Sequence, residues 1–183
     1  MSKLGKKPLL IPTGVEVSLT GKTIEAKGPL GKQSLSFPDE ISLVLNDAMI
    51  KVNQVGETKR AKSMHGTYVR LLANLLTGVN QGFTKVIEVV GTGFKAEMQG
   101  EALLLSLGYS HQITFPAPVG VTIQTLENKI TISGIDCQLV GLTARRIKSL
   151  REPDSYKGKG LRYLGQKLKL KPGKAAAKGV TTK

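Results

Sequence analysis

The sequence predicts an α+β fold of two tandem, similar units, each an antiparallel β-sheet or partial barrel packed with one main helix, plus a basic C-terminal tail. Three observations support this fold class. Apolar residues alternate in short runs bounded by Gly, Pro and Asn, which is typical of antiparallel strands. Each set of strands is followed by apolar spacings of three and four, which indicate a helix. The order of strands and turns in the first half recurs in the second half.

The N-terminal unit, residues 1–82, is predicted to contain a basic arm, a set of strands and one helix. Its strands are separated by turn sequences at Gly21-Lys22, Gly28-Pro29-Leu30-Gly31, Pro38-Asp39-Glu40 and Asn46-Asp47. The helix has one apolar face and ends near Gly82; that face is Met64, Tyr68, Leu71, Leu72, Leu75 and Val79. His65 falls near the start of this helix, where we expect a polar surface or capping side chain.

The C-terminal unit, residues 83–183, is predicted to repeat this plan. Ile113-Thr114-Phe115-Pro116 matches Leu35-Ser36-Phe37-Pro38, which defines an offset in numbering between the two units. The same offset places the next strand, Val119, Val121 and Ile123, on Ile41, Leu43 and Leu45, with two extra residues before the turn at Asn128. Asp136 is a suitable N-cap for a second helix, whose apolar face is Val140, Ala144 and Ile147. Unrelated α+β sequences can share such patterns, so this alternative to a duplication stays open.

Positive charge is concentrated at the C-terminal end of the chain. The 183 residues carry a formal net charge of +14 with a pI near 10.0, which predicts a polyanionic partner. Residues 1–82 contribute +5, residues 83–150 only +1, and residues 151–183 contribute +8. A nearly neutral body therefore precedes a polycationic loop and tail over residues 152–183.

The stretch from Pro153 to Tyr163 is the main candidate binding site. It combines cations, glycines and tyrosines: Tyr156, Lys157, Gly158, Lys159, Gly160, Arg162 and Tyr163. Lysine and arginine neutralise phosphates, glycine lets a backbone approach another molecule closely, and tyrosine stacks on a base or ribose. Little in this stretch favours a helix or a strand, and a solvated basic loop is the alternative interpretation.

Further cations lie on either side of this stretch. The predicted second helix has an exposed cationic face, and just beyond it the chain adds one more arginine: Arg145, Arg146, Lys148 and Arg151. For these residues, nucleic-acid contact and a plain solvated surface are equally open. The tail adds Lys167, Lys169 and Lys171. Aromatic residues make up only 4% of the chain, so recognition should depend on backbone and shape rather than on base edges.

The same stretch resembles a family signature. Pro153, Asp154 and the run from Tyr156 to Tyr163 are similar to the C-terminal signature of bacterial large-ribosomal-subunit protein six. Similar residues follow the family's order along nearly the whole chain, at His65-Gly66-Thr67, Gly82-Phe83-Thr84-Lys85, Gly91-Thr92-Gly93-Phe94 and Leu105-Ser106-Leu107-Gly108-Tyr109-Ser110-His111. Ser155 stands where many members have proline, and the residues after Tyr163 match poorly.

This resemblance implies a structural constituent of the large ribosomal subunit. The C-terminal unit would bind 23S rRNA near the translation-factor site and the stalk base, next to other large-subunit proteins and close to translation factors. The N-terminal unit would be more exposed. Lys157, Lys159 and Arg162 would contact phosphates. Gly158 and Gly160 would allow close approach, while Tyr156 and Tyr163 would pack on sugar or base. The tail from Lys167 to Lys183 would be disordered alone and order on RNA.

Other function classes fit the sequence less well. We expect no enzyme activity, cofactor or metal, because the histidines fall one in each unit and Cys137 is expected to be buried and inert. A single cysteine fits a reducing compartment, and no apolar run approaches the ~20 residues that span a bilayer. We therefore expect a cytoplasmic protein with neither a membrane nor DNA as partner. The alternative function is a general nucleic-acid-binding architectural protein or RNA chaperone.

Overall fold

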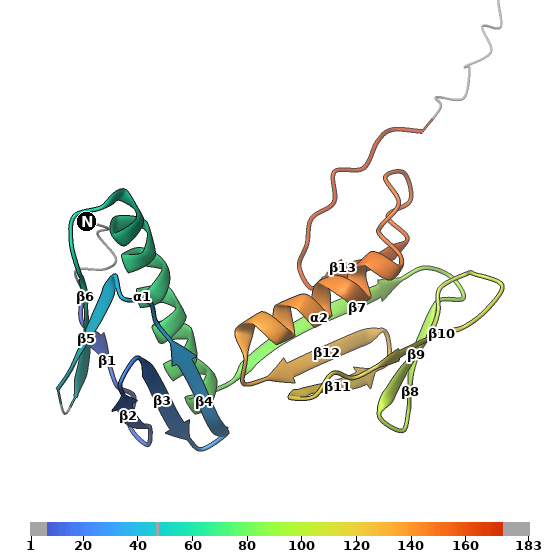
Figure 1. Ribbon diagram of the computed structural model, residues 1–183. Helices are drawn as coiled ribbons and strands as arrows, with labels where there is room; N and C mark the ends of the chain where they lie inside the picture. The colour runs from blue at the N-terminus through green and yellow to red at the C-terminus, as the bar shows by residue number, and fades with distance from the viewer. Residues whose placement is uncertain (1–6, 47, 174–183) are drawn as a thin grey trace, which may run out of the picture. The chain divides into compact units, whose positions relative to one another are not determined.

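The computed structural model describes residues 7–46 and 48–173, so residues 1–6, 47 and 174–183 lie outside the described part, and with them the first half of the predicted N-terminal arm, residues 1–12. The described chain contains two helices and thirteen strands (Figure 1). Its contacts divide it into two units. One is Met1–Thr84 with Val119–Thr122 and Ser133–Leu142, and the other is Lys85–Pro118 with Ile123–Ile132 and Thr143–Lys183. We call residues 9–80 the first repeat and residues 83–163 the second repeat.

The first repeat has two three-stranded antiparallel sheets. One is formed by β2 (Glu16–Thr20), β3 (Thr23–Gly28) and β4 (Gly31–Ser36). The other has the order β1 (Leu9–Leu10), β6 (Met49–Gln54) and β5 (Ile41–Asn46). The pairs Ile24↔Leu35 and Leu43↔Val52 place apolar side chains opposite one another, as the alternating pattern predicts.

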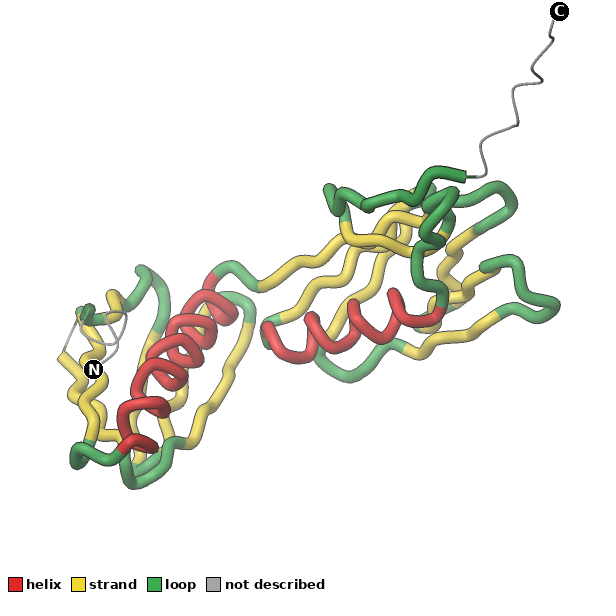
Figure 2. Tube along the Cα trace, turned by 90° about the horizontal axis from the view of Figure 1, so that it is seen from above, coloured by secondary structure: helices red, strands yellow, loops and turns green. Residues whose placement is uncertain are grey.

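Helix α1 (Lys59–Asn80) contacts strands of both sheets in the first repeat (Figures 1 and 2). Thr58 is its N-cap, and the Thr58 hydroxyl accepts a hydrogen bond from the Ala61 N–H at 3.1 Å. The helix ends at Asn80 with Gln81 as its C-cap, and Gly82 follows with a φ of +73°, the left-handed conformation that favours glycine. Of the predicted apolar face, Leu72, Leu75 and Val79 are buried, whereas Met64, Tyr68 and Leu71 are half-buried. The buried core residues of α1 also include Val69 and Leu76.

His65 is inside the first repeat, so the prediction of a surface or capping side chain is wrong. Its side chain is 2% exposed, and its Nε2 atom lies 3.0 Å from the carbonyl oxygen of Val52 in β6. The apolar periodicity of α1 continues through position 65, so the imidazole lies among core residues and uses a strand carbonyl as its polar partner. Its Nδ1 atom has no hydrogen-bond partner within the described chain.

The second repeat has the same plan with one additional strand. Strands β8 (Lys95–Gln99), β9 (Ala102–Ser106) and β10 (Ile113–Pro116) form one antiparallel sheet. The other sheet has the order β11 (Val121–Leu126), β12 (Lys129–Gly134), β7 (Phe83–Val90) and β13 (Gly160–Tyr163). The core of the second repeat includes six residues with no exposed surface, from both sheets: Ile87, Leu103, Leu105, Ile130, Ile132 and Leu161.

Helix α2 (Cys137–Leu150) lies over the four-stranded sheet of the second repeat (Figure 1). The Asp136 carboxylate accepts a hydrogen bond from the Gln138 N–H at 2.7 Å, which confirms the predicted N-cap. Val140, Ala144 and Ile147 are buried, as the helical spacing predicts. Cys137, the first residue of the helix, is half-buried rather than buried.

The two repeats confirm the predicted fold class, but one part of their predicted alignment is wrong. Strand β5 begins at Ile41 and its counterpart β11 begins at Val121, two positions later than the predicted offset allows. Val119, the predicted counterpart of Ile41, is 97% exposed and precedes β11. Strand β4 ends at Ser36 and β10 ends at Pro116, and four residues then separate each of them from the next strand. The two extra residues therefore lie before the end of β10, and not after β11.

Candidate nucleic-acid interface

The segment after α2 returns to the sheet, although the sequence predicted only a loop there. Residues 160–163 form β13, which pairs with β7 in the registers Gly160↔Val90 and Tyr163↔Ile87. Leu161 is fully buried, and its N–H donates to the Arg151 carbonyl at 2.9 Å. Residues 152–159, which we call the basic loop, are therefore attached to the folded repeat at both ends. A strand of four residues is too short to show a clear alternating pattern.

Asp154 shapes the basic loop. Its carboxylate accepts a hydrogen bond from the Lys157 N–H at 2.9 Å, and its carbonyl accepts one from the Gly158 N–H at 3.0 Å. Its own N–H donates to the Lys159 carbonyl at 2.9 Å. The pKa of Asp154 is lowered, first because of the hydrogen bond from the Lys157 backbone. Sequence reasoning gave this residue no role, although Asp at the start of a turn that ends in Gly is a recognisable signal.

The structure gives both loop glycines an intramolecular reason. Gly160 is buried with a φ of +146°, and a Cβ there would lie 2.7 Å from the Glu152 carbonyl oxygen and 2.6 Å from the Pro153 Cα. A close backbone approach at Gly160 is thus made by its own chain. Gly158, at a φ of +69°, lies beside the side chains of Leu168 and Leu170.

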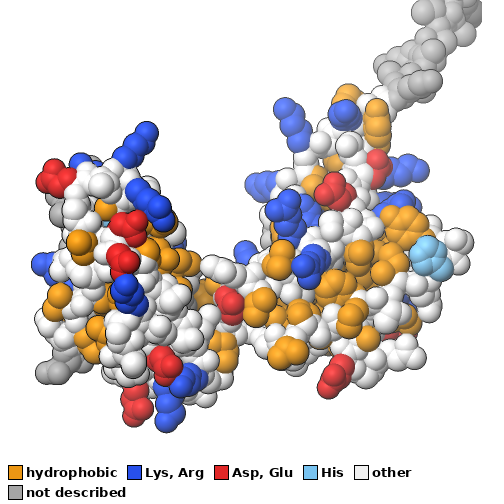
Figure 3. Space-filling model, viewed as in Figure 1, with side chains coloured by type: hydrophobic (Ala, Val, Ile, Leu, Met, Phe, Trp, Pro, Cys, Tyr) orange, Lys and Arg blue, Asp and Glu red, His pale blue; other side chains and the backbone are white. Residues whose placement is uncertain are grey.

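Three predicted contact residues of the basic loop are exposed to solvent. Tyr156 is 58% exposed, and the side chains of Lys157 and Lys159 are exposed as well. Lys159 Nζ donates to the Thr92 hydroxyl at 3.0 Å, which joins the basic loop to the turn between β7 and β8. Figure 3 shows Lys and Arg side chains gathered over α2 and the loop that follows it. This face can neutralise several phosphates at once.

Arg162 and Tyr163 lie on β13 and are half-buried. The Arg162 Nε lies 2.9 Å from the Glu88 carboxylate on β7, an ion pair in which the two side chains are 35% and 22% exposed. Arg162 thus already has an anionic partner, which the sequence did not indicate. The ammonium groups of Lys148 and Lys85 lie over the Tyr163 ring, 5.3 Å and 5.9 Å from its centroid.

The remaining predicted cations adjoin the basic loop. Arg145 and Arg146 are exposed on α2, Lys148 lies in its last turn, and Arg151 directly follows the helix. The Arg151 guanidinium lies 4.9 Å from the ring centroid of Tyr109. A tyrosine in the β9–β10 loop and a cation after α2 are thus neighbours, which only the fold reveals.

The first part of the tail packs against the basic loop. The Lys171 N–H donates to the Ser155 carbonyl at 2.8 Å, and Leu168 lies beside Gly158. Lys167, Lys169 and Lys171 are exposed. Residues 167–173 thus have a described place beside the basic loop, and residues 174–183 lie outside the described part of the chain.

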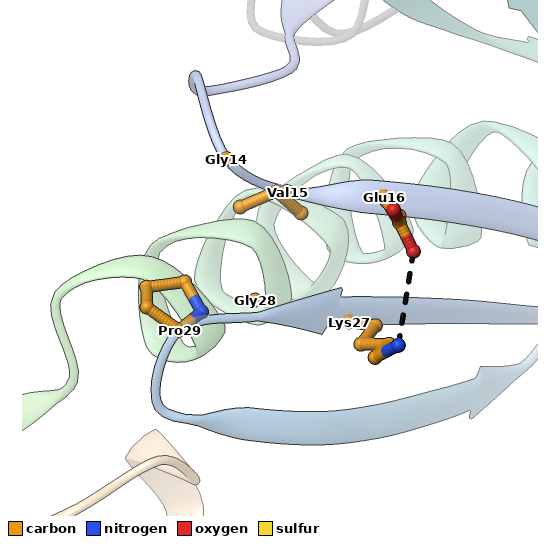
Figure 4. A pocket seen from close by; sticks show the side chains of 6 residues that line it. All are labelled: Gly14, Val15, Glu16, Lys27, Gly28 and Pro29. Carbon is orange, nitrogen blue, oxygen red and sulfur yellow. Dashed lines mark ion pairs between the residues drawn. The ribbon is translucent and has the colours of Figure 1, made fainter.

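A hollow in the first repeat does not resemble a catalytic site. The described residues that line it are Gly14, Val15, Glu16, Lys27, Gly28 and Pro29 (Figure 4). Its charged side chains form an exposed ion pair, with Lys27 Nζ 4.0 Å from the Glu16 carboxylate. Across residues 7–46 and 48–173, no group of three or more His, Cys, Asp and Glu residues could hold a metal ion, and no helix could cross a membrane.

Comparison with known proteins accounts for both repeats. Residues 11–82 and 90–164 match the family model for ribosomal protein L6. The chain belongs to the ribosomal protein L6 family. The second matched segment includes the basic loop and β13 and stops at Leu164, before the lysines of the tail. The match therefore covers the basic loop and β13 but not the tail.

Relatives in the L6 family match almost the full length of the chain. The chain is 49% identical over 179 residues to the large ribosomal subunit protein uL6 of Hydrogenobaculum sp. (strain Y04AAS1), covering 98% of this chain and 99% of that relative. It is 46% identical over 175 residues to the uL6 protein of Cereibacter sphaeroides, and 45% identical over 179 residues to that of Persephonella marina (strain DSM 14350 / EX-H1). Coverage is 95% of this chain and 99% of the relative in the first case, and 97% and 100% in the second.

Proposed function

We propose that this protein is a structural constituent of the large ribosomal subunit that binds 23S rRNA through its C-terminal unit and has no catalytic role, cofactor or metal. The observation that carries the proposal is the basic loop, which Asp154 and β13 fix in place with Lys157 and Lys159 exposed. A loop that is ordered before binding loses little conformational entropy when it meets a rigid polyanion.

The contacts proposed for individual residues follow from their positions. Lys157, Lys159, Arg145, Arg146, Lys148, Arg151, Lys167, Lys169 and Lys171 contact phosphates, and Tyr156 packs on a sugar or base. Gly158, Gly160 and Arg162 hold the loop and β13 in shape, since each already has neighbours within the repeat. Tyr163, on β13, has the ammonium groups of Lys148 and Lys85 over its ring.

We also propose where the two units of the protein lie in the ribosome. The C-terminal unit, residues 83–183, lies near the translation-factor site and the stalk base of a cytoplasmic ribosome, beside other large-subunit proteins. The N-terminal unit, residues 1–82, is more exposed and carries less charge. Supporting this division, residues 151–183 contribute +8 of the net charge of +14.

The decisive experiment is a salt titration. If the protein contacts about six to ten phosphates, raising the salt concentration from about 50 mM to 200 mM should lower its affinity for rRNA about 10³–10⁵-fold. The double variant Lys157→Gln/Lys159→Gln should flatten the plot of log K against log salt for 23S rRNA, by about one to two units of slope. The control replaces Lys51 and Lys62, two exposed lysines of the first repeat, and should leave the slope near that of wild type. Equal slopes for both double variants would remove the basic loop from the interface.

A general nucleic-acid-binding protein or RNA chaperone is the competing function, because it would use the same positive charge. Competition between folded 23S rRNA and duplex DNA of equal length separates the two. A ribosomal constituent should prefer the folded rRNA strongly, whereas a general binder would show similar affinities for both.

A further inference from the structure

Tyr109 and His111 form an exposed ring pair that the contacts proposed above do not use. Both lie in the loop between β9 and β10, with ring centroids 6.2 Å apart and ring planes inclined by 21°. Tyr109 is 43% exposed, and His111 is exposed as well. Exposed aromatic rings on a strongly basic face are a recurrent means of binding single-stranded nucleic acid.

The second repeat holds this ring pair in a fixed place. The Tyr109 hydroxyl donates to the Leu150 carbonyl at 3.1 Å, and the Arg151 guanidinium lies over the Tyr109 ring. The preceding Gly108 lies against Phe94, since a Cβ there would be 3.0 Å from the Phe94 ring. A Cβ at Gly91 would likewise lie 2.9 Å from the Phe94 ring. The β9–β10 loop is therefore tied both to the end of α2 and to the turn between β7 and β8.

The same contacts place the ring pair next to the basic loop. The Arg151 carbonyl accepts a hydrogen bond from the Leu161 N–H, and Lys159 reaches Thr92 in the turn that Phe94 closes. An RNA strand whose phosphates are held by Lys157 and Lys159 would therefore bring its neighbouring nucleotides to Tyr109 and His111.

We propose that the Tyr109–His111 pair is a stacking site for an unpaired nucleobase of the rRNA, with Arg151 bound to a phosphate beside that base. This inference rests on the proposed function and adds a ligand class that charge alone does not specify. RNA displays unpaired bases in loops and bulges, where aromatic rings stack on them without reading their edges. A guanidinium that stacks on a ring keeps its N–H donors in its own plane, where they can reach a phosphate.

The test uses the full chain and transcribed 23S rRNA as the probe. Tyr109→Leu and His111→Ala should each weaken binding about 5- to 150-fold, which corresponds to loss of one stacked base. Their salt slopes should stay equal to that of wild type, because a ring neutralises no phosphate. Tyr109→Phe keeps the ring and loses only the hydroxyl bond to Leu150, so it should weaken binding less than Tyr109→Leu. Ser110→Ala is the control within the same loop and should bind like wild type.

The outcomes separate this inference from the function on which it rests. His111→Ala keeps the test decisive if Tyr109→Leu fails to fold, since the described contact of His111 is the stack on Tyr109. Wild-type affinity in His111→Ala, or equal losses in Tyr109→Phe and Tyr109→Leu, would overturn the stacking site while rRNA preference over duplex DNA persists. Loss of that preference in the wild-type chain would refute the proposed function itself. Photocrosslinking to 4-thiouridine-substituted rRNA should yield adducts at Tyr109 or His111, and adducts confined to residues 155–159 would count against the site.

Discussion

The carboxylate of Asp154 accepts a hydrogen bond from the backbone N–H of Lys157 at 2.9 Å, so one anion fixes the position of a cation three residues later. The Asp154 backbone makes two further hydrogen bonds, with Gly158 and Lys159. The basic loop therefore contains its own support, and the tests below address that support rather than charge alone.

Acid should loosen the basic loop only at low pH. The pKa of Asp154 is lowered from its ordinary value of 3.8, first by the Lys157 hydrogen bond. Because the folded-state pKa is the lower one, the carboxylate stabilises the loop fully above pH 3.8, and this stabilisation is lost as the pH falls through the folded value. The Lys157 amide resonance should be constant from about pH 8 to about pH 5 and should move only below 3.8. In Asp154→Ala this acid transition should be absent, and a midpoint above 3.8 in wild type would refute the assignment.

Gly160→Ala should destabilise the second repeat because both the conformation and the space exclude a side chain. The φ of +146° and the Cβ contacts of 2.6–2.8 Å with Glu152 and Pro153 predict a loss of about 2 kcal/mol or more in urea unfolding. Gly165→Ala is the matched control, because Gly165 has a φ of +75° with nothing within 4 Å of its Cβ. It should lose only about 1 kcal/mol, and equal losses at the two sites would show that the packing around Gly160 contributes nothing.

Arg162 should matter for stability more than for RNA affinity. Its ion pair with Glu88 connects β13 to β7, so a double-mutant cycle with Arg162→Gln and Glu88→Gln should give a coupling of about 1 kcal/mol that shrinks with salt. The salt slope for 23S rRNA should change less in Arg162→Gln than in Lys157→Gln. The opposite order of slopes would return Arg162 to the phosphate contacts.

Removal of residues 167–183 should weaken rRNA binding and reduce the salt slope while leaving β13 in place. Lys167, Lys169 and Lys171 are exposed, whereas the buried Leu161 precedes the cut. Circular dichroism and thermal unfolding would verify that the shortened chain is folded. Truncation after Leu150 is a poor substitute, because it also removes a strand of the sheet. If the chain ending at Gln166 binds with full affinity and an unchanged slope, the tail lysines are not contacts.

Local patterns predicted the elements whose signals are long. The alternating runs and the spacing in residues 64–79 gave the strands and α1, and Asp136 gave the start of α2. A single offset between the repeats already fails at the end of β10, because loops tolerate extra residues that a comparison of strand patterns cannot place. Those patterns could not reveal that β13 pairs with β7, since the two strands lie far apart in the sequence, with α2 and five other strands between them.

The sequence predicted which residue types form the candidate site, but not which residues hold them in place. Composition and the run from Tyr156 to Tyr163 identified the basic loop, and the structure adds Glu88, Thr92 and Asp154 as its partners. His65 could not be assigned to the core from the sequence. A histidine in a helix is expected on the surface unless a buried hydrogen-bond partner is known, and here that partner is the Val52 carbonyl.

The antiparallel pairing of β13 with β7 also determines how the protein would yield to force. Once the contacts of the tail with the basic loop are broken, tension on the chain beyond Tyr163 passes into this pairing, which extends over Gly160–Tyr163 and lies at the edge of the sheet. Peeling the strand would free the Lys-bearing segment while α2 and the inner strands keep their packing.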